Sequence, residues 1–153
     1  CIRDRYNVKG YLENSVYVGI PSQLAMLLEM GYVLSLATSK PTVSASAILE
    51  YFDLTRYFSY EFGSNLDGSL SDKSILLKHA LAVTGFEPNN ALMIGDRQYD
   101  IIGAKSNLIK SVGVSYGYGS TNELREAGAD LLVEKPAELA KAVQKLLPMW
   151  AKR

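Results

Sequence analysis

Two aspartates follow a short apolar run in the second half of the chain. The stretch MIGDRQYDIIGA, residues 93–104, places Asp96 and Asp100 four residues apart, directly after Gly95. Carboxylate oxygens and water are the ligands that Mg²⁺ takes in proteins. The same aspartates could instead cap a helix and stabilise its first turn, because the N-terminal end of a helix favours negative charge. The stretch raises the question of a metal site and leaves both interpretations open.

Polar groups at two other positions could handle phosphate. Thr38 and Ser39 end the apolar run of residues 31–38, just before Pro41, and Lys73 begins a helix-period segment. Hydroxyls and backbone N–H groups at a helix start bind phosphate oxygens, and lysine neutralises phosphate charge. With a bound cation, such groups suit phosphoryl transfer, in which catalysis rests on positioning and charge stabilisation. Taken singly, however, a Thr-Ser pair before proline usually caps a helix, and a lone lysine is usually solvated.

Apolar runs typical of strands alternate with helix-period segments along the chain. We expect strands at residues 31–38, 57–64, 91–95, 110–116 and 130–134, and helices at 22–30, 41–51, 72–84, 100–107, 121–128 and 136–147. This alternation predicts an α/β fold with a parallel sheet covered by helices on both faces. Ligands bind at the carboxyl ends of the strands in such sheets. The polar groups described above lie at those ends or at the start of the following helix.

Composition limits the class of protein. The chain has 153 residues, which suggests one domain, and its 16 basic and 16 acidic residues give no reason to expect nucleic acid or a membrane surface as a partner. Cys1 is the single cysteine, so no intramolecular disulfide can form, which fits a reducing compartment. No apolar run approaches the roughly 18 residues of a membrane-spanning helix. We expect a cytoplasmic protein; its oligomeric state cannot be read from the sequence.

In order and spacing, the candidate motifs resemble those of the haloacid dehalogenase superfamily of phosphatases. LATSKP resembles the second motif of that family, the lysine of SDK resembles the third, and GDRQYD resembles the acidic fourth motif. The stretches GYLENSVYVGI and VSYGYGSTNELREAGAD extend the similarity over roughly residues 5–147. They resemble the phosphoglycolate phosphatase-like and 5′-nucleotidase-like subgroup.

The resemblance implies a Rossmann-like, doubly wound core and a Mg²⁺-dependent phosphatase that acts on a small phosphorylated metabolite. Phosphoglycolate or a nucleoside monophosphate would be hydrolysed through an aspartyl-phosphate. Thr38 would hydrogen-bond the transferring phosphoryl group, Ser39 would line the phosphate site, and Lys73 would neutralise the phosphate and orient the nucleophile. Asp96 would bind Mg²⁺, and Asp100 would bind it or support it through water.

The first motif of the family, DxDGT, has no convincing counterpart. It supplies the nucleophilic aspartate and, with its second aspartate, the general acid and base. Residues 65–69, NLDGS, imitate the motif but carry Asn65 at the nucleophile position. An amide is a poor nucleophile, and the preceding YEFGS does not read as a buried strand. We therefore interpret residues 65–69 as a turn.

A missing first motif has consequences for the fold. In the family, its strand lies between those of the second and fourth motifs, so we expect a gap at the centre of the sheet. Residues 1–15 would be the tail of a helical cap and its return linker, and residues 16–153 would form a partial core domain that lacks the central first strand. Covalent catalysis needs the missing aspartate. The 153-residue chain would then be inactive alone.

Two other functions stay open at this point. The chain could be a catalytically inactive binding or regulatory fragment, which the coding sequence upstream of Cys1 would decide. A receiver-like signalling module also uses acidic residues, a Thr/Ser and a Lys-Pro, but the acidic pair comes first in receivers. In this chain Asp96 comes after Thr38. Lys135 lies almost a hundred residues after Thr38.

Two remaining features have simple interpretations. His79, the only histidine, lies within a predicted helix and is expected to be a surface or packing residue. The loop GYGS, residues 117–120, could approach a ligand through its glycines. A plain loop leading to a helix that Ser120 caps is the favoured interpretation, with Glu123 completing a capping box.

Overall fold

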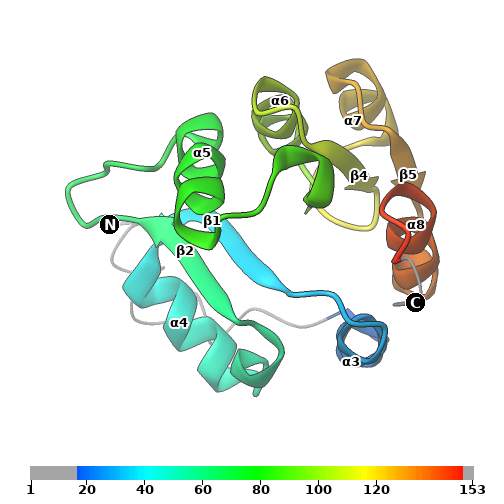
Figure 1. Ribbon diagram of the computed structural model, residues 1–153, viewed down its shortest axis with the longest axis horizontal. Helices are drawn as coiled ribbons and strands as arrows, with labels where there is room; N and C mark the ends of the chain where they lie inside the picture. Colours follow the sequence, from blue (N-terminus) through cyan, green and yellow to red (C-terminus); the bar gives the residue numbers. More distant parts are fainter. Residues whose placement is uncertain (1–16, 150–153) are drawn as a thin grey trace.

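The computed structural model describes residues 17–149 (Figure 1). The expected cap tail and linker at residues 1–15 therefore lie outside the described residues. Five strands alternate with helices in the described range: α3 Ile20–Glu29, β1 Ser35–Pro41, α4 Thr42–Tyr51, β2 Tyr60–Ser64, α5 Lys73–Thr84, β3 Leu92–Gly95, α6 Gln98–Ser106, β4 Lys110–Val114, α7 Thr121–Ala127, β5 Leu131–Val133 and α8 Leu139–Leu146. Short 3₁₀ turns lie at η2 Thr55–Tyr57, η3 Pro88–Asn90 and η4 Pro136–Glu138.

Every strand pairing is parallel. β1 pairs with β2, whereas β3, β4 and β5 pair in that order. Helices α5, α6 and α7 lie on one side of the strands, and α3, α4 and α8 lie on the other (Figure 1). The predicted α/β fold with helices on both faces of a parallel sheet is confirmed.

The strands divide into two sheets between β1 and β3. Within residues 17–149, the strand ladders pair β1 only with β2, and they pair β3 only with β4. A cavity of about 400 Å³ lies between the facing edges, lined by Leu36 and Ala37 of β1 and by Leu92, Met93 and Ile94 of β3. Strand edges without hydrogen-bond partners cost free energy when they are buried and promote aggregation when they are exposed. The predicted gap at the sheet centre is confirmed for the part of the chain that the structure describes.

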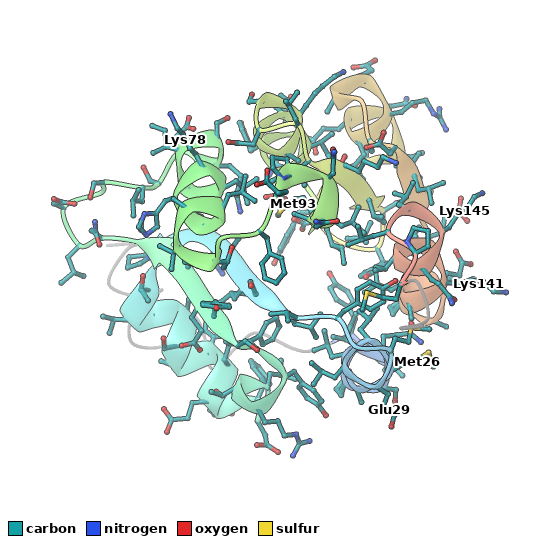
Figure 2. The ribbon with its side chains drawn as sticks, in the orientation of Figure 1. Met26, Glu29, Lys78, Met93, Lys141 and Lys145 are labelled. Atoms are coloured by element: carbon teal, nitrogen blue, oxygen red, sulfur yellow. The ribbon has the colours of Figure 1, made fainter. Side chains whose placement is uncertain are left out.

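Apolar packing fixes the helices that carry the candidate site. Met93 of β3 packs with Leu77 of α5, Ala104 of α6 and Ile109 in one buried cluster. Figure 2 shows Met93 between α5 and α6. This cluster packs α5 and α6 together beside β3.

Helix α8 is amphipathic and covers the other side of the sheet. Leu139 and Val143 are buried, whereas Lys141 and Lys145 project away from the protein (Figure 2). No helix within residues 17–149 is long and apolar enough to cross a membrane.

Local signals explain most helix ends, but several bounds differ from expectation: β1 and β2 begin later than predicted, and Pro41 ends β1 where it was expected to open the following helix. Asp72 caps α5, since its Oδ1 accepts the N–H of Ile75 at 3.2 Å. Helix α6 begins at Gln98 instead of residue 100, which places Asp100 inside its first turn. Strand β1 runs to Pro41 and its pairing is irregular between Ala37 and Pro41, so the Thr-Ser pair lies within the strand's irregular end.

The predicted capping box of α7 forms only in half. Ser120 Oγ accepts the N–H of Glu123 at 3.0 Å, as expected for an N-cap. The Glu123 carboxylate instead accepts from Arg97, with Nε to Oε2 at 3.2 Å. Arg97, which is distant in the sequence, therefore pairs with the Glu123 carboxylate that the local pattern predicted to cap α7.

Candidate active site

One cavity brings together all five residues singled out in the sequence. It has a volume of about 560 Å³ and lies at the carboxyl ends of β1 and β3. Its lining comprises Thr38, Ser39, Lys40, Ser71, Asp72, Lys73, Ser74, Asp96, Arg97, Tyr99, Asp100 and Ile102. Both sheets and the first turns of α5 and α6 contribute to it. The parallel arrangement explains this convergence, because the carboxyl ends of parallel strands meet at one edge.

Lys73 and Asp100 form the buried centre of this cavity. Lys73 Nζ lies 2.9 Å from Asp100 Oδ1 and donates to the carbonyl oxygen of Ala37 at 2.9 Å. The two side chains are only 8% and 11% exposed. An ammonium group has three N–H donors. Two are used in these contacts, which leaves one for a ligand in the cavity.

Asp100 organises the turn that carries Asp96. Its second oxygen, Oδ2, accepts the backbone N–H groups of Asp96 and Arg97, both at 3.2 Å. A side chain at Gly95 would overlap Asp100, so the strand end needs a glycine here. Both carboxylate oxygens of Asp100 therefore have protein partners.

Asp96 is held on one side only. Its Oδ2 accepts the backbone N–H of Tyr118 at 3.0 Å, and no described residue hydrogen-bonds to Oδ1. The side chain of Tyr116 lies near Asp96. Burial raises the pKa of Tyr116 to about 12, with smaller contributions from Tyr17 and Asp96. The free oxygen of Asp96 is thus available to a ligand in the cavity.

Thr38, which is half-buried, and Ser39, which is exposed, line the cavity from the end of β1. Thr38 Oγ1 accepts the N–H of Lys40 at 3.2 Å, which fixes the irregular end of β1. The hydroxyl hydrogen of Thr38 can still donate to an anion, because accepting one bond leaves the donor unused.

The acidic residues fit a weakly held cation better than a protein cage. Among the described residues, no group of three or more His, Cys, Asp and Glu side chains could hold a metal ion. Mg²⁺ typically keeps several waters and binds through one or two carboxylates plus substrate phosphate. One free oxygen on Asp96, supported by Asp100, is compatible with that mode.

Residues 65–69 form the expected turn. Gly68 N–H donates to the carbonyl of Asn65 at 2.9 Å, and Ser69 N–H donates to Asp67 Oδ1 at 2.9 Å. None of the residues in this range lines the 560 Å³ cavity. His79 is exposed on α5, with its ring edge-on to Phe62 at 6.0 Å, which confirms the surface or packing role.

The favoured interpretation of residues 117–120 as a plain loop was incomplete. The loop caps α7 as expected, but it also contacts Asp96 through Tyr118. The paired glycines in GYGS were the available signal, because glycine permits close backbone approach. Arg97 was not predicted as a lining residue either.

Together, the parallel α/β fold and its helices bring a Thr, Lys and Asp set to one cavity at the carboxyl edge of the strands. A family comparison identifies the particular class. The model of the haloacid dehalogenase-like hydrolases matches residues 2–114, and this chain belongs to that family.

Three relatives illustrate the family's range. The chain is 44% identical over 123 residues to a 5′-nucleotidase from Pseudomonas aeruginosa, covering 80% of this chain and 56% of that protein. It is 38% identical over 117 residues to the tyrosine-protein kinase PtkA from Mycobacterium tuberculosis, covering 76% and 40%. The crystal structure of a predicted phosphatase from Clostridium acetobutylicum superposes with a TM-score of 0.91 and 45% identity, covering 94% and 66%. The chain thus spans about half the length of the curated relatives named here.

Proposed function

We propose that the whole protein is a Mg²⁺-dependent phosphatase of small phosphomonoesters, such as a nucleoside monophosphate or phosphoglycolate. The observation that carries this proposal is the convergence of Thr38, Ser39, Lys73, Asp96 and Asp100 on one 560 Å³ cavity. Membership of a hydrolase family and the name of the Pseudomonas aeruginosa relative support it.

Each residue then has a role set by its contacts. Thr38 donates its hydroxyl hydrogen to a phosphoryl oxygen, and Ser39 lines the same wall. The remaining N–H of Lys73 neutralises phosphate charge, while its bond to Asp100 keeps the ammonium in place. Asp96 would hold Mg²⁺ through its carboxylate, and Asp100, which accepts the N–H groups of Asp96 and Arg97, would fix the turn that carries Asp96. The cation, when bound, offsets phosphate charge during transfer.

The nucleophile is proposed to lie outside these residues, on a strand between β1 and β3. An apolar strand inserted there would pair with both open edges and would end in the cavity that holds the phosphate. Its first aspartate would attack phosphorus and displace the alkoxide, which the second aspartate of the motif would protonate, giving an aspartyl-phosphate and the alcohol. The second aspartate would then take a proton from water as the water attacks phosphorus, which breaks the aspartyl-phosphate bond, releases phosphate and restores the carboxylate. We propose accordingly that residues 16–153 belong to a partial core domain.

Complementation in trans tests the proposal. We expect the purified chain with Mg²⁺ to leave a chromogenic phosphate ester intact. A peptide of four branched apolar residues followed by Asp-X-Asp-Gly-Thr should restore hydrolysis, because its apolar part matches the length of β3. The same peptide with the first aspartate changed to asparagine is the control. Turnover by the chain alone, abolished by Asp96→Asn, would show that the catalytic set is misassigned.

The kinase name of one relative gives a second candidate, transfer of a phosphoryl group to a tyrosine. A fold alone does not determine the acceptor. Incubating the complemented chain with ATP and a tyrosine peptide, and separately with the phosphate ester, distinguishes transfer to tyrosine from transfer to water.

A further inference from the structure

The loop of residues 117–119 lies directly against Asp96. It follows β4 in the chain, whereas Asp96 follows β3, so the contact joins two neighbouring strand ends. Tyr118 N–H donates to Asp96 Oδ2 at 3.0 Å. This is the single hydrogen bond that the described residues make to the Asp96 carboxylate.

The two glycines permit this close approach. A Cβ atom at Gly117 would lie 2.6 Å from Asp96 Oδ2 and would also overlap Asp96 Cβ. A Cβ at Gly119 would overlap the Asp96 carbonyl oxygen and Glu123 Oε2. Neither glycine has a left-handed φ, so space and not backbone conformation demands glycine at both positions.

An ion pair between Arg97 and Glu123 lies beside the loop. Glu123, whose carboxylate lies beside Gly119, accepts from Arg97 Nε at 3.2 Å and from Arg97 Nη2 at 3.3 Å. Arg97 follows Asp96 directly in the chain. Asp100 therefore holds the backbone of residues 96–97, whereas the loop and Glu123 hold the side chains of Asp96 and Arg97.

We propose that Gly117, Tyr118 and Gly119 form a positioning clamp for Asp96. The clamp occupies Oδ2 through a backbone donor and leaves Oδ1 directed to a divalent cation. This inference rests on the proposed function, because it assumes that Asp96 binds the cation. Residues that orient a metal ligand typically change metal affinity by about 10–100-fold when replaced.

Mn²⁺ binding measured by electron paramagnetic resonance tests the clamp on the full 153-residue chain. We expect Gly117→Ala to weaken Mn²⁺ binding by about tenfold or more, because the new methyl group displaces the carboxylate. Gly68→Ala is the control: it adds a methyl group at a strained turn with φ +87 and meets nothing within 4 Å. Thermal unfolding of both variants confirms that they are folded. Equal Mn²⁺ affinity of folded Gly117→Ala and wild type overturns the clamp while the proposed function stands.

A second readout separates failure of the clamp from failure of the function. If the wild-type chain binds no Mn²⁺, the metal role of Asp96 is wrong. The clamp is then decided by hydrogen exchange at the Tyr118 amide, which needs no metal. Loss of protection in Asp96→Ala supports the clamp contact, and unchanged protection overturns it. Should Gly117→Ala fail to fold, Gly119→Ala and the same amide measurement give the answer.

Discussion

Lys73 and Asp100 form a buried ion pair that joins α5 to α6 at the floor of the site. Their atoms Nζ and Oδ1 lie 2.9 Å apart, and Asp100 also accepts two backbone N–H groups. The pair therefore links the Lys73 ammonium group to the turn that carries Asp96. Stability and site geometry depend on the same contact.

Replacing Lys73 with methionine should destabilise the chain. The uncharged side chain leaves the Asp100 carboxylate buried without its partner, which typically costs about 3–5 kcal/mol. Urea unfolding measures the change. Lys78→Met is the matched control, since Lys78 is exposed on the same helix and projects outward (Figure 2). Equal stability of the two variants would contradict a buried, structurally important ion pair.

Adding a methyl group at Gly103 should also destabilise the chain, against the usual trend. Alanine is favoured over glycine inside a helix by about 1 kcal/mol. Here the Cβ would lie 2.9 Å from Lys73 Cγ and 3.1 Å from the Lys73 backbone. Overpacking of this kind costs about 1–3 kcal/mol. A rise in the unfolding free energy of Gly103→Ala would show that α5 and α6 are less tightly packed.

Tyr116 makes stability depend on alkaline pH. Burial raises the pKa of Tyr116 to about 12, above the ordinary tyrosine value of 10.0. Between these values the folded chain keeps the phenol proton that the unfolded chain releases, so stability falls as pH rises. Chemical denaturation at pH 9, 10 and 11 should show a steeper decline for wild type than for Tyr116→Phe. Parallel declines would mean that the phenol is not buried as described.

The alternation of elements, the open sheet centre and the convergence of five residues were all predictable from the sequence. Apolar runs and helix-period segments carry their own local signals, and parallel strands bring their carboxyl ends together. Thr38 and Asp96 could therefore be placed at one edge although they lie far apart in the chain.

The contacts that refine the site were not predictable in the same way. Glu123 has a local capping pattern, yet Arg97, 26 residues earlier, takes its carboxylate. Asp100 was expected to bind the metal or support it through water, yet both its oxygens have protein partners. The pairing of Glu123 with Arg97 and of Asp100 with Lys73 depends on tertiary distances between elements, which leave no periodic trace in the sequence. The role of the loop at Gly117 was hidden for the same reason.

Trapping of the phosphorylated intermediate tests the central claim most directly. The chain and the complementing peptide are mixed with Mg²⁺ and an ester carrying labelled phosphate, and the reaction is quenched in acid. We predict label on the peptide, lost when its first aspartate is changed to asparagine and reduced in Asp96→Asn. Label on residues 1–153, or hydrolysis without any labelled peptide, would contradict the account that this chain supplies phosphate and metal binding to a nucleophile carried elsewhere.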